Sequence, residues 1–339
     1  VRPVIQLLNL IYRSDTPPLL AGRMSRTERI VHRMKRIAVL ILCITLLAGC
    51  LAGCGEAPAS SGKLQVVATL FPQYDFARRV AGDRAAVTML LPPGVESHSF
   101  DPTPADLVTM QKADLFLYTG AQMETWAGSL LSSLPESTTV VDLSQGIALS
   151  GEAHDEGSDG HSHLADPHIW TSPKNAMIMV ASIRDALCSA DPDGAAIYEE
   201  NANQYLEELA ELDAAFRDIV ANGKRRTLAF SGRFALHYFA EEYGLDCVAA
   251  LESCSGESEP SAQSVARVIS VIREQGLPVV YYEELSDPKV GRSIASETGV
   301  QLLLFHSCHN LSKDEFDRGE TYLSLMRQNA ENLKVVLNG

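Results

Sequence analysis

The sequence predicts an α/β protein of two lobes, each with a four-stranded parallel sheet and surrounding helices, joined by one long backbone helix. Short β-rich runs alternate with helical segments over residues 64–144, and the same alternation returns over residues 226–337. Between them lies a long helical stretch with an apolar stripe. Strands that alternate with helices of about ten residues are typical of parallel βαβ units.

The first lobe is expected over residues 64–172. Branched and aromatic residues predict its strands, and apolar residues at helical spacing predict the helices between them. An Asp-Pro pair gives the start signal of the second helix. The expected strands are 64–70, 87–92, 115–120 and 138–144, and the expected helices are 72–82, 101–113 and 123–133.

A helical connector is expected over residues 173–223, with helices over 175–190 and 195–223. The second helix would be about 40 Å long at 1.5 Å per residue, which is enough to run along both lobes. Its apolar stripe has a period of 3.6 residues and consists of Tyr198, Ala202, Tyr205, Leu206, Leu209, Leu212, Ala215, Phe216 and Ile219.

The second lobe is expected over residues 224–339, where the alternation of strands and helices returns. The expected strands are 226–230, 246–251, 278–282 and 300–305, and the expected helices lie within 233–243 and over 261–275, 287–299 and 319–337.

The amino-terminal region has the layout of a secretory signal. We expect the chain to start at Met34, with residues 1–33 as a mis-assigned upstream extension and residues 34–53 as a lipoprotein signal peptide. Two bases precede an apolar run of eleven residues, 37–47. A helix that spans a bilayer needs about 20 residues, so this run is too short to be one.

Two cysteines end LAGC tetrapeptides that resemble the bacterial lipobox. Cys54, or alternatively Cys50, is therefore the expected lipidation site, with residues 54–63 as a flexible tether to the membrane. A plain cleaved signal or a short anchor helix is the alternative. The remaining residues, 54–339, contain 20 Lys and Arg against 41 Asp and Glu. A body this acidic argues against nucleic acid as a partner.

Histidines follow three of the expected strands, at places where open parallel sheets bind their ligands. His98 follows the second strand, His168 follows the fourth, and His306 follows the last. Imidazole is the commonest protein ligand for zinc. One such histidine would be an ordinary loop residue, but three at matching edges predict a shared metal site. A fourth equivalent place carries Arg233.

Six segments together resemble the zinc and manganese substrate-binding lipoproteins of ABC importers. In the order of that family, the chain carries TLFPQYDFARRVAGD, LLPPGVESHSFDPTPADL, GAQMETWAGSLL, DPHIWTSPKNA, YFAEEYGL and GESEPSA. The resemblance implies two lobes joined by one long helix, with a metal at their interface. It also implies partnership with an ABC permease and its ATPase, and we expect a monomer.

The resemblance implies that His98 and His168 are the first two metal ligands, with His306 at or within one residue of the fourth. Arg233 stands where the family carries its third ligand, and a guanidinium cannot bind a cation. Two alternatives stay open. His237, His306 or a carboxylate of Glu283 or Glu284 completes the ligand set, or Arg233 pairs with an acid and water fills the gap.

Imidazole ligands favour zinc over manganese, so Zn²⁺ is the expected transported ligand. A Mn²⁺ or Fe²⁺ binding protein of the same transporter class is one alternative. A zinc-dependent hydrolase is the alternative from a different class, with Glu96 as its best candidate base. The sequence shows no HExxH motif and no nucleophile elbow, so we expect that the protein is not an enzyme.

The stretch over residues 154–163 is rich in glycine, serine and acids and has no periodicity, which is typical of a loop. Its histidines, His154, His161 and His163, are expected to collect zinc weakly. The exported part holds Cys188, Cys247, Cys254 and Cys308. A disulfide between Cys254 and Cys308 is expected, and four buried thiols are the alternative. Glu124 is expected to be an acid at a helix start.

Overall fold

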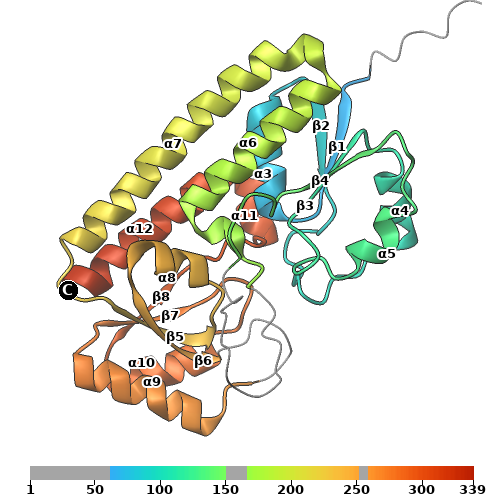
Figure 1. Cartoon of the computed structure of the whole chain (residues 1–339). Helices are drawn as coiled ribbons and strands as arrows, with labels where there is room; N and C mark the ends of the chain where they lie inside the picture. Colours follow the sequence, from blue (N-terminus) through green and yellow to red (C-terminus); the bar gives the residue numbers. More distant parts are fainter. Residues whose placement is uncertain (1–61, 150–165, 252–258) are drawn as a thin grey trace, which may run out of the picture. The chain divides into compact units, whose positions relative to one another are not determined.

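The computed structural model describes residues 62–149, 166–251 and 259–339. Within these residues, two four-stranded parallel sheets with surrounding helices and one long helix confirm the predicted fold class (Figure 1). Several predicted residues lie outside the described ranges, namely Cys50, Cys54, His154, His161, His163 and Cys254.

The first sheet has the strand order β2-β1-β3-β4, and every neighbouring pair is parallel. Its central strand β1 pairs Val66 with Val87 on one side and with Leu115 on the other. The elements in chain order are β1 (Leu64–Ala68), α3 (Phe71–Ala81), β2 (Ala85–Met89), α4 (Pro104–Met110), β3 (Leu115–Tyr118), α5 (Ala127–Leu131) and β4 (Thr139–Asp142).

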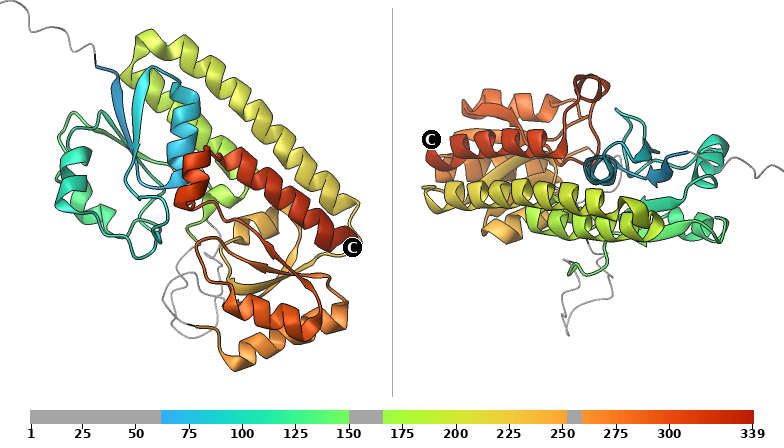
Figure 2. Two further views of the ribbon diagram at one scale, coloured as in Figure 1. Left: turned by 180° about the vertical axis from the view of Figure 1, so that it is seen from behind. Right: turned by 90° about the horizontal axis from the view of Figure 1, so that it is seen from above.

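The connector consists of α6 (Pro173–Ala190) and α7 (Ala195–Ala221), joined by a short 3-10 turn. Helix α7 packs against α3 and α6 beside the first sheet, and against α8 and α12 beside the second (Figure 2). Most of its predicted stripe is buried, including Tyr198, Leu209 and Phe216. One helix therefore spans both lobes. None of the helices in the described ranges is both long and apolar enough to cross a membrane.

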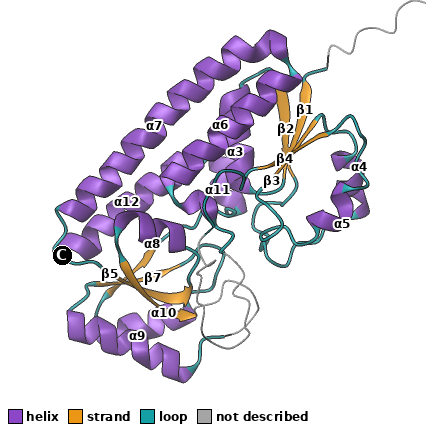
Figure 3. Ribbon diagram, viewed as in Figure 1, coloured by secondary structure: helices purple, strands orange, loops and turns teal. Residues whose placement is uncertain are grey.

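The second sheet repeats the arrangement with the order β6-β5-β7-β8, again parallel throughout (Figure 3). Its elements are β5 (Thr227–Arg233), α8 (His237–Tyr243), β6 (Asp246–Leu251), α9 (Ala262–Gln275), β7 (Val279–Tyr282), α10 (Lys289–Thr298), β8 (Gln301–Leu304), α11 (Lys313–Arg318) and α12 (Tyr322–Asn338).

Helix α11 is one element that the sequence reading missed. Its first turn is closed by a capping box, in which Ser312 accepts from the backbone N–H of Glu315 and Glu315 accepts from the N–H of Ser312. The S-x-x-E pattern is a known helix-start signal. At six residues, the helix was too short for the periodicity on which the prediction relied.

The two lobes are tied together by hydrogen bonds from buried side chains of one lobe to backbone carbonyls of the other. Trp170 follows the first sheet and donates from Nε1 to the carbonyl of Ser307 in the second lobe, at 2.8 Å. Buried Asn310 donates from Nδ2 to the carbonyls of Pro92 and Val95, at 2.9 and 2.8 Å. The loop after β2 and the loop after β8 therefore hold each other in place.

Candidate metal centre

His98 lies on the loop after β2, the loop that Asn310 holds from the second lobe. Its ring is mostly buried, and its Nε2 lies 3.2 Å from the Nε2 of His168. Burial, and then the neighbouring charge of His168, lowers the pKa of His98 from 6.5 to about 4. This imidazole is therefore neutral near pH 7, which is the form that binds metals.

His168 follows the first sheet and is completely buried. Asp166 accepts from the backbone N–H of His168 at 2.8 Å, and the same oxygen lies 2.8 Å from the ring Nδ1. Burial alone would raise the pKa of Asp166, but its hydrogen bonds with His168 hold that pKa below its usual value. The ionised carboxylate places the ring proton on Nδ1 and leaves the lone pair of Nε2 facing His98.

The geometry of this pair is that of two ligands to one ion. Two ligands of a tetrahedral zinc, each about 2.0–2.1 Å from the metal, lie about 3.3–3.4 Å apart. The separation of 3.2 Å between the two Nε2 atoms is close to that edge. Two facing imidazole lone pairs repel each other unless a proton or a cation lies between them.

His309 is a third histidine beside this pair, and the sequence reading missed it. Its ring centroid lies 6.3 Å from that of His98 and 6.5 Å from that of His168. Its Nδ1 faces Glu284 Oε1 at 3.0 Å and Ser307 Oγ at 2.5 Å. As with His168, a carboxylate holds Nδ1 and leaves Nε2 available for a metal.

Glu284 therefore lies behind His309. One of its oxygens accepts from the backbone N–H of Ser307 at 2.8 Å and the other from Ser307 Oγ at 2.6 Å. Burial alone would raise the pKa of Glu284, but the charges of His306 and His309 and the hydrogen bonds of His309 and Ser307 hold it well below its usual value. A carboxylate in this position orients a ligand.

The ring of His306 is buried between two carboxylates, with its Nδ1 3.5 Å from Glu284 Oε1 and its Nε2 4.0 Å from Glu315 Oε1 of α11. Its Nδ1 accepts from the N–H of Cys308 at 2.9 Å, and Asn329 binds its backbone N–H and carbonyl, each at 2.7 Å. Cys308 has a positive φ of 62°, and the chain reverses there. Both histidines of HSCHN lie beside Glu284 Oε1, but His309 is the one that lines the cavity next to the pair, which a strand-end rule cannot foresee.

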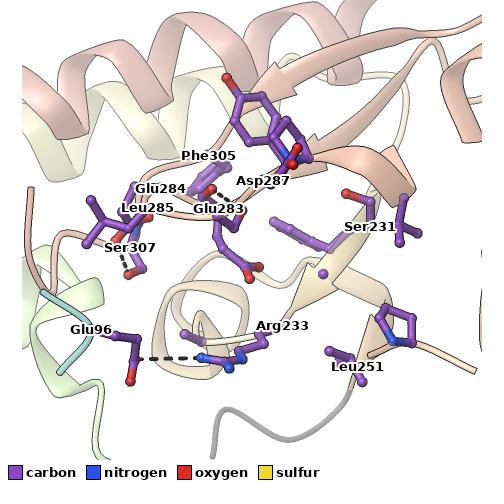
Figure 4. Close-up of a pocket in the computed structure, with 18 of the residues that line it drawn as sticks. Glu96, Ser231, Arg233, Leu251, Glu283, Glu284, Leu285, Asp287, Phe305 and Ser307 are labelled. Carbon is purple, nitrogen blue, oxygen red and sulfur yellow. Dashed lines mark hydrogen bonds and ion pairs between the residues drawn. The ribbon is translucent and has the colours of Figure 1, made fainter. Parts of the chain in front are cut away.

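His237 also lies apart from the pair, at the first residue of α8, and its side chain is half exposed. Its Nε2 is 3.7 Å from Asp166 Oδ2. Arg233 faces an acid, as one of the alternatives from the sequence had it: its Nη1 lies 3.6 Å from Glu96 Oε1 (Figure 4).

A cavity of about 400 Å³ lies in front of these groups. His98, His168, His309, Arg233, Glu96 and Glu283 are among the residues that line it. Burial, and then the charge of Glu284, raises the pKa of Glu283 to about 7. In the described parts of the chain, no three His, Cys, Asp or Glu side chains already stand close enough to hold a metal together. His309 is the distant member, since tetrahedral ligation would bring ring centroids to about 5 Å.

Cys308 is the one member of the expected disulfide that the structure describes, so the pairing with Cys254 stays a prediction. Cys308 is fully buried, and its Sγ faces the carbonyl of His306 at 3.8 Å. The turn that separates His306 from His309 therefore encloses this cysteine in the core. Its expected partner, Cys254, lies outside the described residues.

Comparison with known proteins gives a consistent result. The family model described as the periplasmic component A of the zinc-uptake complex, ZnuA, matches residues 66–336. The high-affinity zinc uptake system protein ZnuA of Bacillus subtilis is 35% identical over 305 residues, which cover 87% of this chain and 95% of that protein. The zinc-binding lipoprotein AdcA of Streptococcus pneumoniae is 33% identical over 308 residues, and this chain spans only 61% of its length.

Solved structures agree with this result. The Zn(II)-bound ZnuA-like domain of S. pneumoniae AdcA matches with a TM-score of 0.71 at 30% identity, over 82% of this chain and all of that domain. A Mn-bound periplasmic metal binding protein of Candidatus Liberibacter asiaticus, an S38A mutant, matches with a TM-score of 0.69 at 26% identity, over 81% of this chain and all of its own. On this similarity in sequence and fold, the chain belongs to the ZnuA family of zinc-uptake components.

Proposed function

We propose that this protein captures Zn²⁺ outside the cytoplasm and delivers it to the permease of an ABC importer. The observation that carries the proposal is the pair of Nε2 atoms of His98 and His168, 3.2 Å apart, with the Nδ1 of His168 bound to Asp166. In the proposed bound state, a Zn²⁺ ion bound to both atoms takes the place of the proton that two facing imidazole nitrogens would otherwise share.

His309 is the third ligand in this proposal. Its Nε2 reaches the metal when its ring moves about 1 Å toward the pair, which brings the centroids to the separation expected for one zinc ion. The fourth position is left to water, because Arg233 cannot bind a cation and faces Glu96. His306, His237 and Glu284 are not ligands in this arrangement.

The donor set favours zinc over the alternative metals. Three imidazoles suit Zn²⁺, whereas Mn²⁺ prefers a set rich in oxygen. A relative with bound manganese shows that the fold itself accepts Mn²⁺. We assign no reaction to the site, and we place the anchoring lipid on Cys54 or Cys50.

Equilibrium dialysis of the purified chain against zinc and manganese, followed by elemental analysis, tests the proposal. We expect one tightly bound zinc per chain and a higher melting temperature at micromolar zinc, because a ligand of the native state stabilises it. A chain that takes up no zinc and shows no melting shift would disprove the proposal. Tighter binding of manganese would assign the other metal.

A further inference from the structure

The carboxylate of Asp166 has two oxygens with different surroundings. Oδ1 binds the backbone N–H and the Nδ1 of His168. Oδ2 is buried and has no hydrogen-bond partner among the residues that the structure describes, and the side chain as a whole is 9% exposed. A buried carboxylate oxygen without a donor is costly, so such an atom in a native structure calls for an explanation.

The group that faces this oxygen is the imidazole of His237. Its Nε2 lies 3.7 Å from Oδ2, which is too long for a hydrogen bond. The ring packs edge-on against Phe234, with centroids 4.6 Å apart, and Tyr238 donates from its hydroxyl to the carbonyl of Asp166 at 2.7 Å. Helix α8 and Asp166 are therefore fixed relative to each other.

The distance fits a metal ion better than a hydrogen bond. One nitrogen and one oxygen ligand of a tetrahedral zinc lie about 3.3–3.5 Å apart. A shift of a few tenths of an ångström would let one ion contact both Nε2 and Oδ2. Half of the His237 side chain is exposed, so an ion can arrive from solvent with its waters.

We propose that His237 and Asp166 Oδ2 form a second, weaker Zn²⁺ site, at which the ion first binds before it moves to His98, His168 and His309. The proposal rests on the function proposed above, because it takes Zn²⁺ as the cargo. Two protein ligands leave the remaining positions to water, so the ion is held loosely and can leave. Asp166 links the two sites, since its other oxygen binds His168.

Zinc titration calorimetry on the full chain tests this site. His154, His161 and His163 are first replaced by Asn, so that the expected collecting loop contributes nothing. We expect this parent to bind one zinc tightly and a second zinc more weakly. His237→Gln should remove the weak event and leave the affinity of the tight event within about threefold, and the surviving tight event also shows that the variant is folded.

Glu241→Gln is the matched control, because it removes a charge one turn along the same helix and leaves Asp166 in place. It should keep both events. A parent that binds a single zinc, a weak event that survives His237→Gln, or a tight event that His237→Gln abolishes would each overturn the second site. Loss of the tight event from the parent itself would instead count against the proposed function.

Discussion

The carboxyl ends of the two sheets each hold a buried glutamate, and the two acids have different surroundings. In the first lobe, Glu124 accepts from the backbone N–H groups of Thr119 and Gly120, at 3.1 and 3.2 Å, and from the hydroxyl of Thr69. In the second lobe, Glu284 faces His309 at 3.0 Å. Glu124 thus accepts hydrogen bonds from backbone donors of its own lobe, whereas Glu284 orients a histidine.

Their pKa values differ accordingly. Burial raises the pKa of Glu124 to about 7, because no cationic or histidine side chain compensates it. The neighbouring histidines hold the pKa of Glu284 below its usual value in spite of its burial. A buried acid at a strand end is therefore not by itself a sign of a metal site, and its partners decide its role.

The largest effect is expected from the histidines themselves. We expect a loss of zinc affinity from each of the variants His98→Ala, His168→Ala and His309→Ala. Each loss should exceed the roughly 10–100-fold that is typical when only the group hydrogen-bonded to a metal ligand is removed. His306→Ala is the control, because its ring is buried between Glu284 and Glu315 and is not a ligand in the proposed arrangement, and it should change zinc affinity by less than about threefold. A His306 variant that loses zinc while His309→Ala keeps it would reverse our assignment.

The two glutamates give the next effect and test the comparison directly. Glu284→Gln should weaken zinc binding by about 10–100-fold, because His309 loses the carboxylate that fixes its ring. Glu124→Gln should leave zinc affinity unchanged and lower the free energy of unfolding by about 1–3 kcal/mol, because its new amide faces backbone donors. Chemical denaturation and zinc titration of both variants separate the two roles. Equal zinc affinities for the two variants would remove the distinction.

Arg233→His should raise zinc affinity by about tenfold, since it exchanges a cation for an imidazole beside an open coordination position. Arg233→Gln removes the charge without adding a ligand, and a smaller change is expected for it. Competition with a zinc-sensitive dye measures both variants. A similar gain in the two would show that the charge of Arg233, and not the missing ligand, limits the affinity.

The last prediction concerns the stability of the zinc-free protein, and it does not involve zinc affinity. The folded state holds the pKa of His98 at about 4 instead of 6.5, so the unfolded chain binds more protons between these values. Stability is therefore expected to fall as the pH drops from about 6.5 toward 4, by up to about 3 kcal/mol from this group. Denaturation curves of the unsubstituted protein and of His98→Ala at several pH values measure the difference. If the stability of the unsubstituted protein depends on pH no more steeply than that of His98→Ala, the lowered pKa of His98 is contradicted.

Sequence patterns predicted the fold because each lobe repeats the same local signals. The alternation of strands and helices, and the stripe from Tyr198 to Ile219, depend only on neighbours along the chain. The site depended on a turn that such patterns do not encode. His306 follows β8 directly and was chosen for that reason, but the positive φ at Cys308 turns His309 toward the metal centre.

The pairing of carboxylates with the proposed ligands His168 and His309 could not be predicted from the sequence either. Asp166 precedes His168 by two residues, while Glu284 reaches His309 from another strand end. One local signal did exist for the missed helix α11, the capping box of Ser312 and Glu315. Long-range pairing of side chains is the part that needed the folded structure.

Anomalous diffraction at the zinc edge, from crystals of the loaded protein, tests the central claim most directly. We expect one strong peak about 2.0–2.1 Å from the Nε2 atoms of His98, His168 and His309, with Glu284 behind the third ring and His306 still between Glu284 and Glu315. A peak bound by His306, or a peak without His309, would contradict the account.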